Sequence, residues 1–273
     1  CDGIPAWGGC LPQLTTPSAT SITSTGATTG GDVTADGGAS VTARGMAYGT
    51  TSAAGPQPCP GTPTVTDVDN NTYNTVPIGT QCWTQSNLKV SKYRNGDSIP
   101  TGLSNSAWEN TTSGAYAIYD NAPVNDGLYG KLYNHYAVTD SRGLCPTGWH
   151  IPSDGEWNIL VKYFDPNADT VCANCTQSGA GGALKSTATQ PTLGGWLSPN
   201  TGATNSSGFT ALPGGLRFYY GNFYYLSANG FWWSSSVSSG SFAWTRYLYN
   251  NTSYIDRYDY NRTGGFSVRC CRD

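Results

Sequence analysis

Charged residues are scarce in this sequence. They make up 11% of the 273 residues, with 14 basic against 17 acidic side chains. A protein that binds nucleic acid places many Lys and Arg side chains on phosphates, and this chain has no basic stretch that could do so. No apolar run approaches the roughly 20 residues that a membrane-spanning helix needs. We therefore expect neither a nucleic-acid partner nor a membrane span.

Catalytic motifs are missing as well. The chain has two histidines, His135 and His150, and it contains no nucleophile elbow, no phosphate-binding loop and no metal-binding histidine pair. We expect each histidine to be a hydrogen-bonded structural residue. The sequence therefore predicts neither an enzyme nor a required cofactor.

Methionine occurs once, whereas cysteine occurs nine times, in a chain rich in Gly, Ser, Thr and Asn. This usage is typical of an oxidising compartment, in which disulfides persist. With 37% hydrophobic residues, nine Trp and eighteen Tyr, the chain has enough apolar material for a packed core. We expect an extracellular globular protein with one large domain or two modest ones.

The strongest local signal lies in Tyr129–Trp157, YGKLYNHYAVTDSRGLCPTGWHIPSDGEW. The segment 131–138 alternates as a strand does. Ser153 and Glu156 then form an S-x-x-E capping box that starts a helix. Four apolar residues behind it have helical spacing and predict one buried face: Trp157, Leu160, Val161 and Phe164.

This stretch also carries a family resemblance. The segments GKLYNHYAV, GLCPTGWHIPSDGEW and GGFSVRCCRD, preceded by VTDVDNNTY at 65–73, IGTQCW at 78–83 and NLK at 87–89, make the chain similar to the Fibrobacter succinogenes major paralogous domain over about three quarters of its length. The resemblance implies a C-type-lectin-like α+β fold whose distal half consists of strands and long loops. It implies no single biochemical activity.

We expect three segments: an extended arm at 1–17, an incomplete all-β, Ig- or fibronectin-like module with a Pro-rich linker at 18–60, and the lectin-like domain at 61–273. Runs of β type at 21–24, 27–33 and 41–48 are followed by Pro56–Pro63, although a complete sandwich needs about seven strands. Exposed strand edges template pairing with other chains, so something must cover this module. Either the arm of a second copy completes it by β-augmentation, or the module packs on its own lectin-like domain.

Within the lectin-like domain we expect two principal helices, one after Ser153 and one at 179–186, and a short helix at 103–110. Segment 121–127 is predicted to be a turn-rich loop. The expected strands are 65–68, 73–78, 81–88, 115–120, 216–220, 223–226, 231–235, 243–249, 254–258 and 265–270.

Disulfides are the default interpretation of the cysteines. Cys172 and Cys175 form a lone C-x-x-C and predict a local bridge. Cys82, Cys145, Cys270 and Cys271 lie inside the family motifs, and the resemblance implies two bridges that tie the C-terminal strand to the core, with the partners open. Cys10 and Cys59 bracket the N-terminal region and are expected to pair, unless Cys10 joins Cys1 and Cys59 pairs elsewhere. A chain that begins at cysteine also resembles a bacterial lipoprotein, so Cys1 is the expected lipidation site.

The last sixty residues are rich in tyrosine mixed with Asn, Ser, Gly and Trp. Tyrosine gives a large contact area at low entropic cost, while the small polar residues supply adaptable hydrogen bonds. We predict ligand binding by the exposed tyrosines, whereas Trp232, Trp233 and Trp244 are expected in the core. The candidate ligand-binding residues are Tyr219, Tyr220, Tyr224, Tyr225, Tyr247, Tyr249, Tyr254 and Tyr258.

Calcium is the candidate ion, because Asp67, Asp69 and Asn71 have the alternating spacing of oxygen ligands in a loop. Asp120, Asn125 and Asp126 are further oxygen donors. The triplets typical of calcium-dependent sugar-binding lectins are missing. Asn-x-Ser/Thr triplets predict glycosylation in exposed loops at Asn70, Asn110, Asn174, Asn205, Asn250, Asn251 and Asn261.

Together these features predict a non-enzymatic, extracellular structural or adhesive protein of a bacterial surface. The leading hypothesis is a filament or fimbria-like homopolymer, assembled by strand complementation, that displays the lectin-like domain. The alternative is a monomeric, lipid-anchored protein that recognises a protein or a glycan through its Tyr-rich face.

Overall fold

The computed structural model describes residues 13–15, 32–35 and 57–273. The chain divides into two compact units, Cys1–Ala54 and Gly55–Asp273. In the first unit, β1 (Gln13–Thr15) pairs antiparallel with β2 (Asp32–Ala35), with Leu14 opposite Val33. β1 belongs to the predicted arm, and β2 overlaps the predicted strand 27–33. The predicted strands 21–24 and 41–48 lie outside the described residues, as do Cys1 and Cys10.

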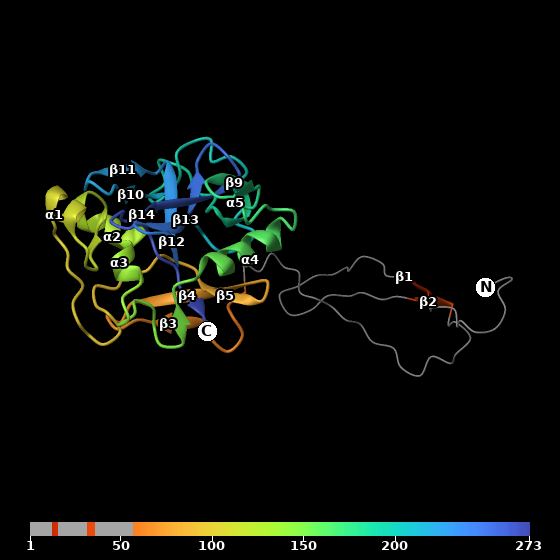
Figure 1. The fold of residues 1–273 in the computed structure, drawn as a ribbon. Coiled ribbons are helices and arrows are strands. Elements are labelled where there is room, and N and C mark those ends of the chain that lie inside the picture. The colour runs from red at the N-terminus through yellow and green to blue at the C-terminus, as the bar shows by residue number, and fades with distance from the viewer. Residues whose placement is uncertain (1–12, 16–31, 36–56) are drawn as a thin grey trace. The chain divides into compact units, whose positions relative to one another are not determined.

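The second unit is a mixed α+β domain built on two sheets (Figure 1). The smaller sheet has the order β3-β4-β5-β15-β8: β3 (Thr64–Thr66), β4 (Thr72–Ile78), β5 (Gln81–Thr84), β15 (Cys271–Arg272) and β8 (Trp149–His150). The last strand, β15, therefore lies between β5, from the start of the domain, and β8, from the middle of its sequence. This arrangement closes the domain on itself.

The larger sheet has the order β11-β10-β12-β13-β14-β9. A long antiparallel meander forms its centre, and shorter strands flank it. The bounds are β9 (Cys175–Ser178), β10 (Gly214–Arg217), β11 (Phe223–Leu226), β12 (Asn229–Ser239), β13 (Phe242–Tyr249) and β14 (Ile255–Asn261). A separate short ladder joins β6 (Tyr116–Ala117) to β7 (Leu132–Tyr133).

The main helix, α4 (Asp154–Phe164), begins where the capping box predicts. The Ser153 hydroxyl accepts from the Glu156 backbone N–H at 3.2 Å, and Glu156 Oε2 accepts from the Ser153 N–H at 2.7 Å. Its apolar face packs into an aromatic core in which Trp157 lies 4.9 Å from Trp83 and 5.8 Å from Phe209. The predicted cap and buried face are confirmed.

Five α-helices occur in the described part of the chain. Besides α4, these are α1 (Asn105–Asn110), α2 (Pro123–Tyr129), α3 (His135–Val138) and α5 (Gly181–Leu184), and a 3₁₀ turn, η1, spans Tyr119–Asn121. Helices α4, α1 and α5 fall at the three expected helices, after Ser153, at 103–110 and at 179–186, whereas α2 and α3 are additional. The predicted loop at 121–127 is wrong, because Pro123 at the first helical position has the φ that starts α2.

The strand predicted at 131–138 is also wrong beyond Tyr133. Asn134 ends it, because its Oδ1 accepts from the backbone N–H groups of Ala115 at 2.9 Å and Ala137 at 3.0 Å. These bonds cap α3 and place His135 in a helix. Trp232 and Trp233 are buried as expected, whereas Trp244 is only half-buried and lies against the Arg257 guanidinium.

Three disulfides join described cysteines: Cys59–Cys82, Cys145–Cys270 and Cys172–Cys175. The expected Cys10–Cys59 bridge is wrong, since Cys59 pairs with Cys82. The expected bridge from Cys271 is wrong as well, because this thiol is free and buried. Cys271 lies opposite Trp83 in the sheet, and neighbouring residues on a strand point to opposite faces. Cys82 therefore faces away from Cys271.

Candidate functional site

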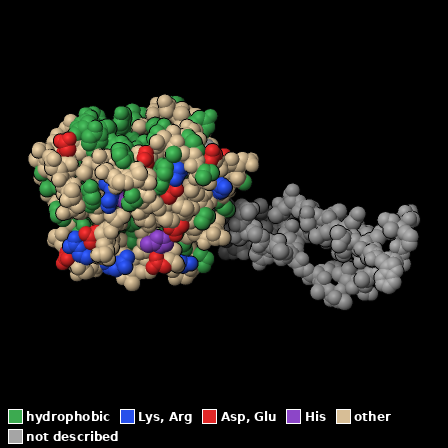
Figure 2. Space-filling view, in the orientation of Figure 1, with side chains coloured by type: hydrophobic (Ala, Val, Ile, Leu, Met, Phe, Trp, Pro, Cys, Tyr) green, Lys and Arg blue, Asp and Glu red, His purple; other side chains and the backbone are tan. Residues whose placement is uncertain are grey.

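Four of the predicted ligand-binding tyrosines meet on one hairpin, formed by β10 and β11. Its strands pair with Arg217 opposite Phe223 and Leu216 opposite Tyr224. The Phe218 ring lies at the centre, with ring centroids 5.0 Å from Tyr219, 4.4 Å from Tyr220 and 5.7 Å from Tyr224. Figure 2 shows hydrophobic side chains gathered along the upper edge of the domain, where Figure 1 places this hairpin. We call residues 218–226 the Tyr hairpin.

Three of the four hairpin tyrosines are exposed. Tyr219, Tyr224 and Tyr225 have 38%, 37% and 52% of their surface exposed. The Tyr220 and Tyr224 hydroxyls are hydrogen-bonded to each other at 3.2 Å, and this bond raises the pKa of Tyr220 to about 12. Tyrosine hydroxyls, which can both donate and accept hydrogen bonds, therefore line the edge of the hairpin.

A second tyrosine group lies on β13 and β14. The Tyr247 and Tyr258 rings stack at 5.3 Å with an interplanar angle of 15°, and Tyr249 lies 6.5 Å from Tyr247. Phe231 connects this group to the hairpin, with ring centroids 4.6 Å from Tyr247 and 6.1 Å from Tyr225. These three tyrosines are half-buried. They contact the hairpin indirectly, because Tyr247 packs against Phe231 and Phe231 packs against Tyr225.

Tyr254 is exposed, but it does not belong to this aromatic network. It lies before β14, and its carbonyl stands beside Gly181 of α5, so close that a Cβ on Gly181 would collide with it. The structure thus brings together seven of the eight predicted tyrosines and leaves Tyr254 apart.

A groove opens beside the Tyr hairpin. It has a cavity volume of about 620 Å³ and mixes aromatic rings with amides and one carboxylate. Asp120 and Asn121 line the groove. Their backbone lies in the left-handed region, with φ of 55° and 53°. Such conformations are unfavourable for most residues and cluster at functional sites. The lining residues are Asn105, Tyr119, Asp120, Asn121, Gly221, Asn222, Phe223 and Tyr224.

A buried arginine holds the groove in shape. Arg217 donates from Nε to the Gly221 carbonyl at 2.8 Å and from Nη2 to the Leu103 carbonyl at 2.7 Å, and its guanidinium lies over the Trp108 ring at 4.3 Å. The turn residue Gly221 has φ of +102° and leaves no room for a Cβ against Asn105. The hairpin tip is therefore fastened to α1 by rigid contacts.

Sequence reasoning missed most of this groove. Its lining comes from α1 and η1 and from the hairpin turn and β11, and at least 100 positions along the chain separate the first two from the last two. The sequence predicts Asp120 only as an oxygen donor in a loop. The signal that could have found the groove is the Gly221-Asn222 turn placed between two aromatic pairs, because such a turn presents an amide beside rings.

The candidate calcium residues lie in the turn between β3 and β4. Asp67 Oδ1 accepts from the backbone N–H groups of Asp69 and Asn71, both at 2.9 Å, and its Oδ2 accepts from the Tyr73 hydroxyl at 2.6 Å. Asp69 Oδ1 lies 3.3 Å from Lys92 Nζ. A calcium ion would have to replace these donors, so the calcium site stays a prediction.

The predicted glycosylation sites fall into two groups. Asn70, Asn110, Asn174 and Asn251 are exposed, as attachment of a glycan requires. The others are half-buried and hydrogen-bonded: Asn205 to Thr210, Asn250 to the Ser198 carbonyl and Asn261 to Thr263.

His135 is a buried neutral residue. Its Nδ1 accepts from Arg262 Nε at 3.2 Å, which leaves the Nε2–H to donate to the Ser234 carbonyl at 3.1 Å. Burial and the Arg262 charge lower its pKa to about 3. This environment suits a structural residue, as expected, because a general base needs a pKa near the working pH.

Comparisons with known proteins give a family but no close relative. No curated protein and no solved structure matches the chain. No helix in the described part of the chain is long and apolar enough to cross a membrane. The model of the Fibrobacter succinogenes major domain, which points to a surface-associated protein family, matches residues 76–272. The chain therefore belongs to the Fibrobacter succinogenes major domain family.

Proposed function

We propose that the second unit is a non-enzymatic binding domain displayed outside a bacterial cell, and that the Tyr hairpin with its groove binds a glycan. The groove carries this proposal, because it combines exposed rings with amide and carboxylate groups in a rigid cavity. Aromatic walls with a few convergent polar groups are typical of ligand sites, and tyrosine with asparagine is typical of binding surfaces. A protein epitope is the other candidate ligand for the same face.

A C-type-lectin-like architecture fits this proposal. The first and last strands of the domain belong to one sheet, in which β15 lies between β5 and β8, and the opposite part is built from hairpins and loops. Lectin-like domains of this kind bind ligands through their distal loops. The groove is lined in part by α1 and β11, which lie on the side of the domain away from the C-terminus (Figure 1).

The test is a glycan array probed with the full chain, followed by titration of any glycan found. Tyr224→Ala combined with Asn222→Ala should lower the affinity at least about 10-fold, since central aromatic contacts dominate binding energies. Tyr254→Ala is the matched control, because it removes an exposed tyrosine outside the network. Equal losses in both variants, or none in the double variant, would contradict the glycan site. Binding only to proteins in a parallel screen would select the other ligand class.

We also propose homopolymer assembly through the first unit. This proposal rests on the pairing of β1, which has three residues, with β2, which has four. A short two-stranded ribbon is marginally stable in water, and β1 belongs to the arm that is the candidate donor strand. The pairing that β1 makes within one chain is the pairing that an arm from a second copy would make between chains.

Electron microscopy and light scattering of the full chain and of a chain lacking residues 1–17 test assembly. We expect filaments from the full chain and folded, discrete particles from the truncated one. Monomers from both would exclude strand donation and favour a monomeric surface protein, for which mass spectrometry of the cell-derived protein would detect lipid on Cys1.

A further inference from the structure

Three potential metal ligands of different chemistry meet at the pairing of β8 with β15. His150 and Cys271 lie directly opposite each other in the antiparallel register, so their side chains share one face. Glu156 reaches the same point from the first turn of α4. One imidazole nitrogen, one carboxylate oxygen and one sulfur lie within 4.8 Å of one another.

The imidazole is held as a ligand is held in known metal sites. His150 Nδ1 lies 2.6 Å from Asp273 Oδ1, and Nε2 lies 2.7 Å from Glu156 Oε1. Metal-bound histidines commonly donate their other ring N–H to a carboxylate, which sets the tautomer and the direction of the ring. Asp273 does this for Nδ1, and Nε2 therefore faces Glu156 and Cys271.

The Glu156 carboxylate is also fixed in advance. Its Oε2 accepts from the Ser153 N–H and from the Ser153 hydroxyl, both at 2.7 Å, as part of the helix cap. Its Oε1 faces His150. The cap therefore orients the carboxylate and leaves one oxygen directed into the cluster, so that little ordering is needed to bind an ion.

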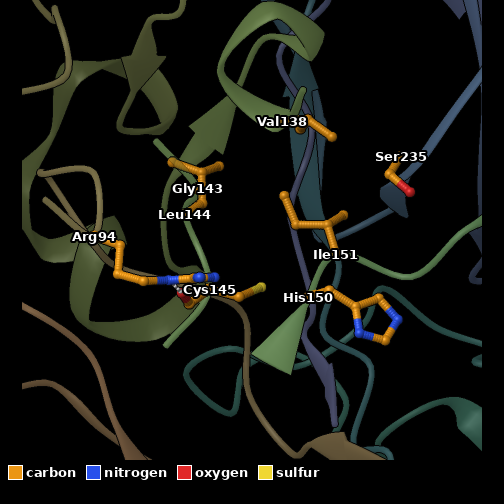
Figure 3. Close-up of a pocket in the computed structure, with 8 residues that line it drawn as sticks. All are labelled: Arg94, Val138, Gly143, Leu144, Cys145, His150, Ile151 and Ser235. Carbon is orange, nitrogen blue, oxygen red and sulfur yellow. Dashed lines mark hydrogen bonds between the residues drawn. The ribbon is translucent and has the colours of Figure 1, made fainter. Parts of the chain in front are cut away.

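Cys271 is the third potential ligand of the cluster. It is the free cysteine among the described residues and has 2% of its surface exposed. The His150 and Glu156 side chains are 38% and 28% exposed, so the cluster is open on one side. His150 borders a pocket of about 270 Å³, in which its ring stands at the end away from Arg94 (Figure 3). The exposed parts of His150 and Glu156, rather than this pocket, give an ion access to the cluster and room for a water ligand.

We propose that His150, Glu156 and Cys271 bind a zinc-type divalent metal ion, with Asp273 as a positioning residue. Imidazole, carboxylate and thiolate are the ligand types of zinc, and three protein ligands with one open position are typical of accessible zinc sites. Bond lengths of about 2.0–2.3 Å place tetrahedral ligands roughly 3.3–3.8 Å apart. The three ligand atoms lie within 4.8 Å of one another, so the widest separation has to shrink by up to about 1 Å. His150 Nε2 and Glu156 Oε1, 2.7 Å apart, have to separate by roughly 0.6 Å to admit the ion. Binding releases the thiol proton, and any proton on Nε2, to solvent.

The other candidate metal ligands do not compete with this site. Cys172 and Cys175 are joined to each other, and His135 uses both ring nitrogens in hydrogen bonds. An ion at the proposed site would connect β8, α4 and β15. It would therefore fasten the last strand to the main helix of the domain.

Cobalt substitution tests the site in the full chain without reductant. One Co²⁺ per chain should give a sulfur-to-cobalt charge-transfer band, displaced by Zn²⁺, and the band should vanish in Cys271→Ser. Glu156→Gln keeps the capping box, since Gln also serves there, but should weaken Zn²⁺ binding. Asp273→Asn should weaken it about 10- to 100-fold, as loss of an orienting carboxylate does.

The matched control replaces both Cys172 and Cys175 by Ser, which should leave the band unchanged. A thiol titration of the unfolded, unreduced chain should find the Cys271 thiol in wild type and lose one thiol in Cys271→Ser. Wild-type protein that gives no charge-transfer band, a band that survives in Cys271→Ser, or equal thiol counts in the two proteins would overturn the proposal. Unchanged Zn²⁺ affinity in both Glu156→Gln and Asp273→Asn would overturn the assigned ligand set.

Discussion

The two ends of the second unit use their polar side chains in opposite ways. Beside α4, buried charged groups are paired with one another: Asp154 bridges Arg246 at 2.9 Å and Arg257 at 2.8 Å. At the Tyr hairpin, hydroxyls and amides are exposed around a groove, and charges are few. Figure 2 shows hydrophobic side chains gathered along the upper edge of this face and charged side chains spread over the rest of it. One end is built for stability and the other retains hydrogen-bonding capacity for a ligand.

The comparison also explains the low charge content of the chain. Six basic side chains of the described residues are buried: Lys131, Lys185, Arg217, Arg246, Arg257 and Arg269. Lys185, for example, donates to the carbonyls of Thr201, Tyr249 and Thr252. Long loops leave backbone carbonyls without strand partners, and buried cations satisfy them. Much of the scarce charge therefore serves the interior instead of the surface.

The largest expected effect comes from removing a buried cation at the stable end. Arg269→Met deletes bonds to the carbonyls of Thr84, Phe209 and Thr210 and to Asn87 Oδ1. Each buried acceptor left unpaired costs about 1–3 kcal/mol, so we expect the free energy of unfolding to fall by more than about 3 kcal/mol. Denaturant unfolding measures this. Arg272→Met, at an exposed neighbouring residue, is the control and should change the free energy of unfolding little. Similar losses of stability in the two variants would contradict the contrast between buried and exposed charges.

A smaller effect is expected from Asp154→Asn, which leaves the buried Arg246 without its counter-charge. Breaking such a pair costs about 3 kcal/mol. Burial opposes ionisation of Asp154, but hydrogen bonds from Arg257 and the charge of Arg246 outweigh it and hold its pKa below the ordinary 3.8. The stabilisation is therefore present above 3.8 and is lost as the pH falls through the lower folded-state pKa. Unfolding at several acidic pH values should show the variant approaching wild type. The control is the surface ion pair of Asp140 and Arg142. Asp140→Asn should lower the free energy of unfolding by at most about 1 kcal/mol.

His150 should give the same end a weaker dependence of opposite sign. Partial burial disfavours its charge, but hydrogen bonds to Asp273 and Glu156 prevail and raise its pKa above the ordinary 6.5. Its contribution is thus complete below 6.5 and is lost as the pH rises through the folded-state pKa. In EDTA, the gap in denaturation midpoint between wild type and His150→Gln should shrink with rising pH. A gap that grows would contradict this sign.

The smallest effect on stability should come from the hairpin. Tyr224→Ala with Tyr225→Ala removes two exposed rings, and we expect a loss below about 1 kcal/mol, as is common for surface positions, together with loss of ligand binding. Thermal unfolding and glycan binding on the same preparations separate the two. A stability loss comparable to that of Arg269→Met would show that the hairpin is part of the core and would break the comparison.

Some features were predictable because they depend on neighbours in the sequence. Ser153, Glu156 and the spacing of Trp157, Leu160 and Val161 determined where α4 begins and which face it buries, since capping and helical periodicity act over a few residues. The alternation of aromatic residues placed β11, β12 and β13 close to their true positions. The motifs of the central stretch sufficed for the family.

Tertiary contacts decided the rest. Asn134 turned a predicted strand into α3 because its partner is the Ala115 N–H, and Cys271 stays a thiol because strand pairing turns it away from Cys82. The groove joins residues 105–121 to residues 221–224, which are 100 to 119 positions apart along the chain. The cluster of His150, Glu156 and Cys271 joins residues 6 to 121 positions apart. By itself the sequence determined local starts, buried faces and family. Which polar groups meet was decided by the folded chain, because hydrogen bonds and ligand sets require proximity in space, which strand order and side-chain direction create.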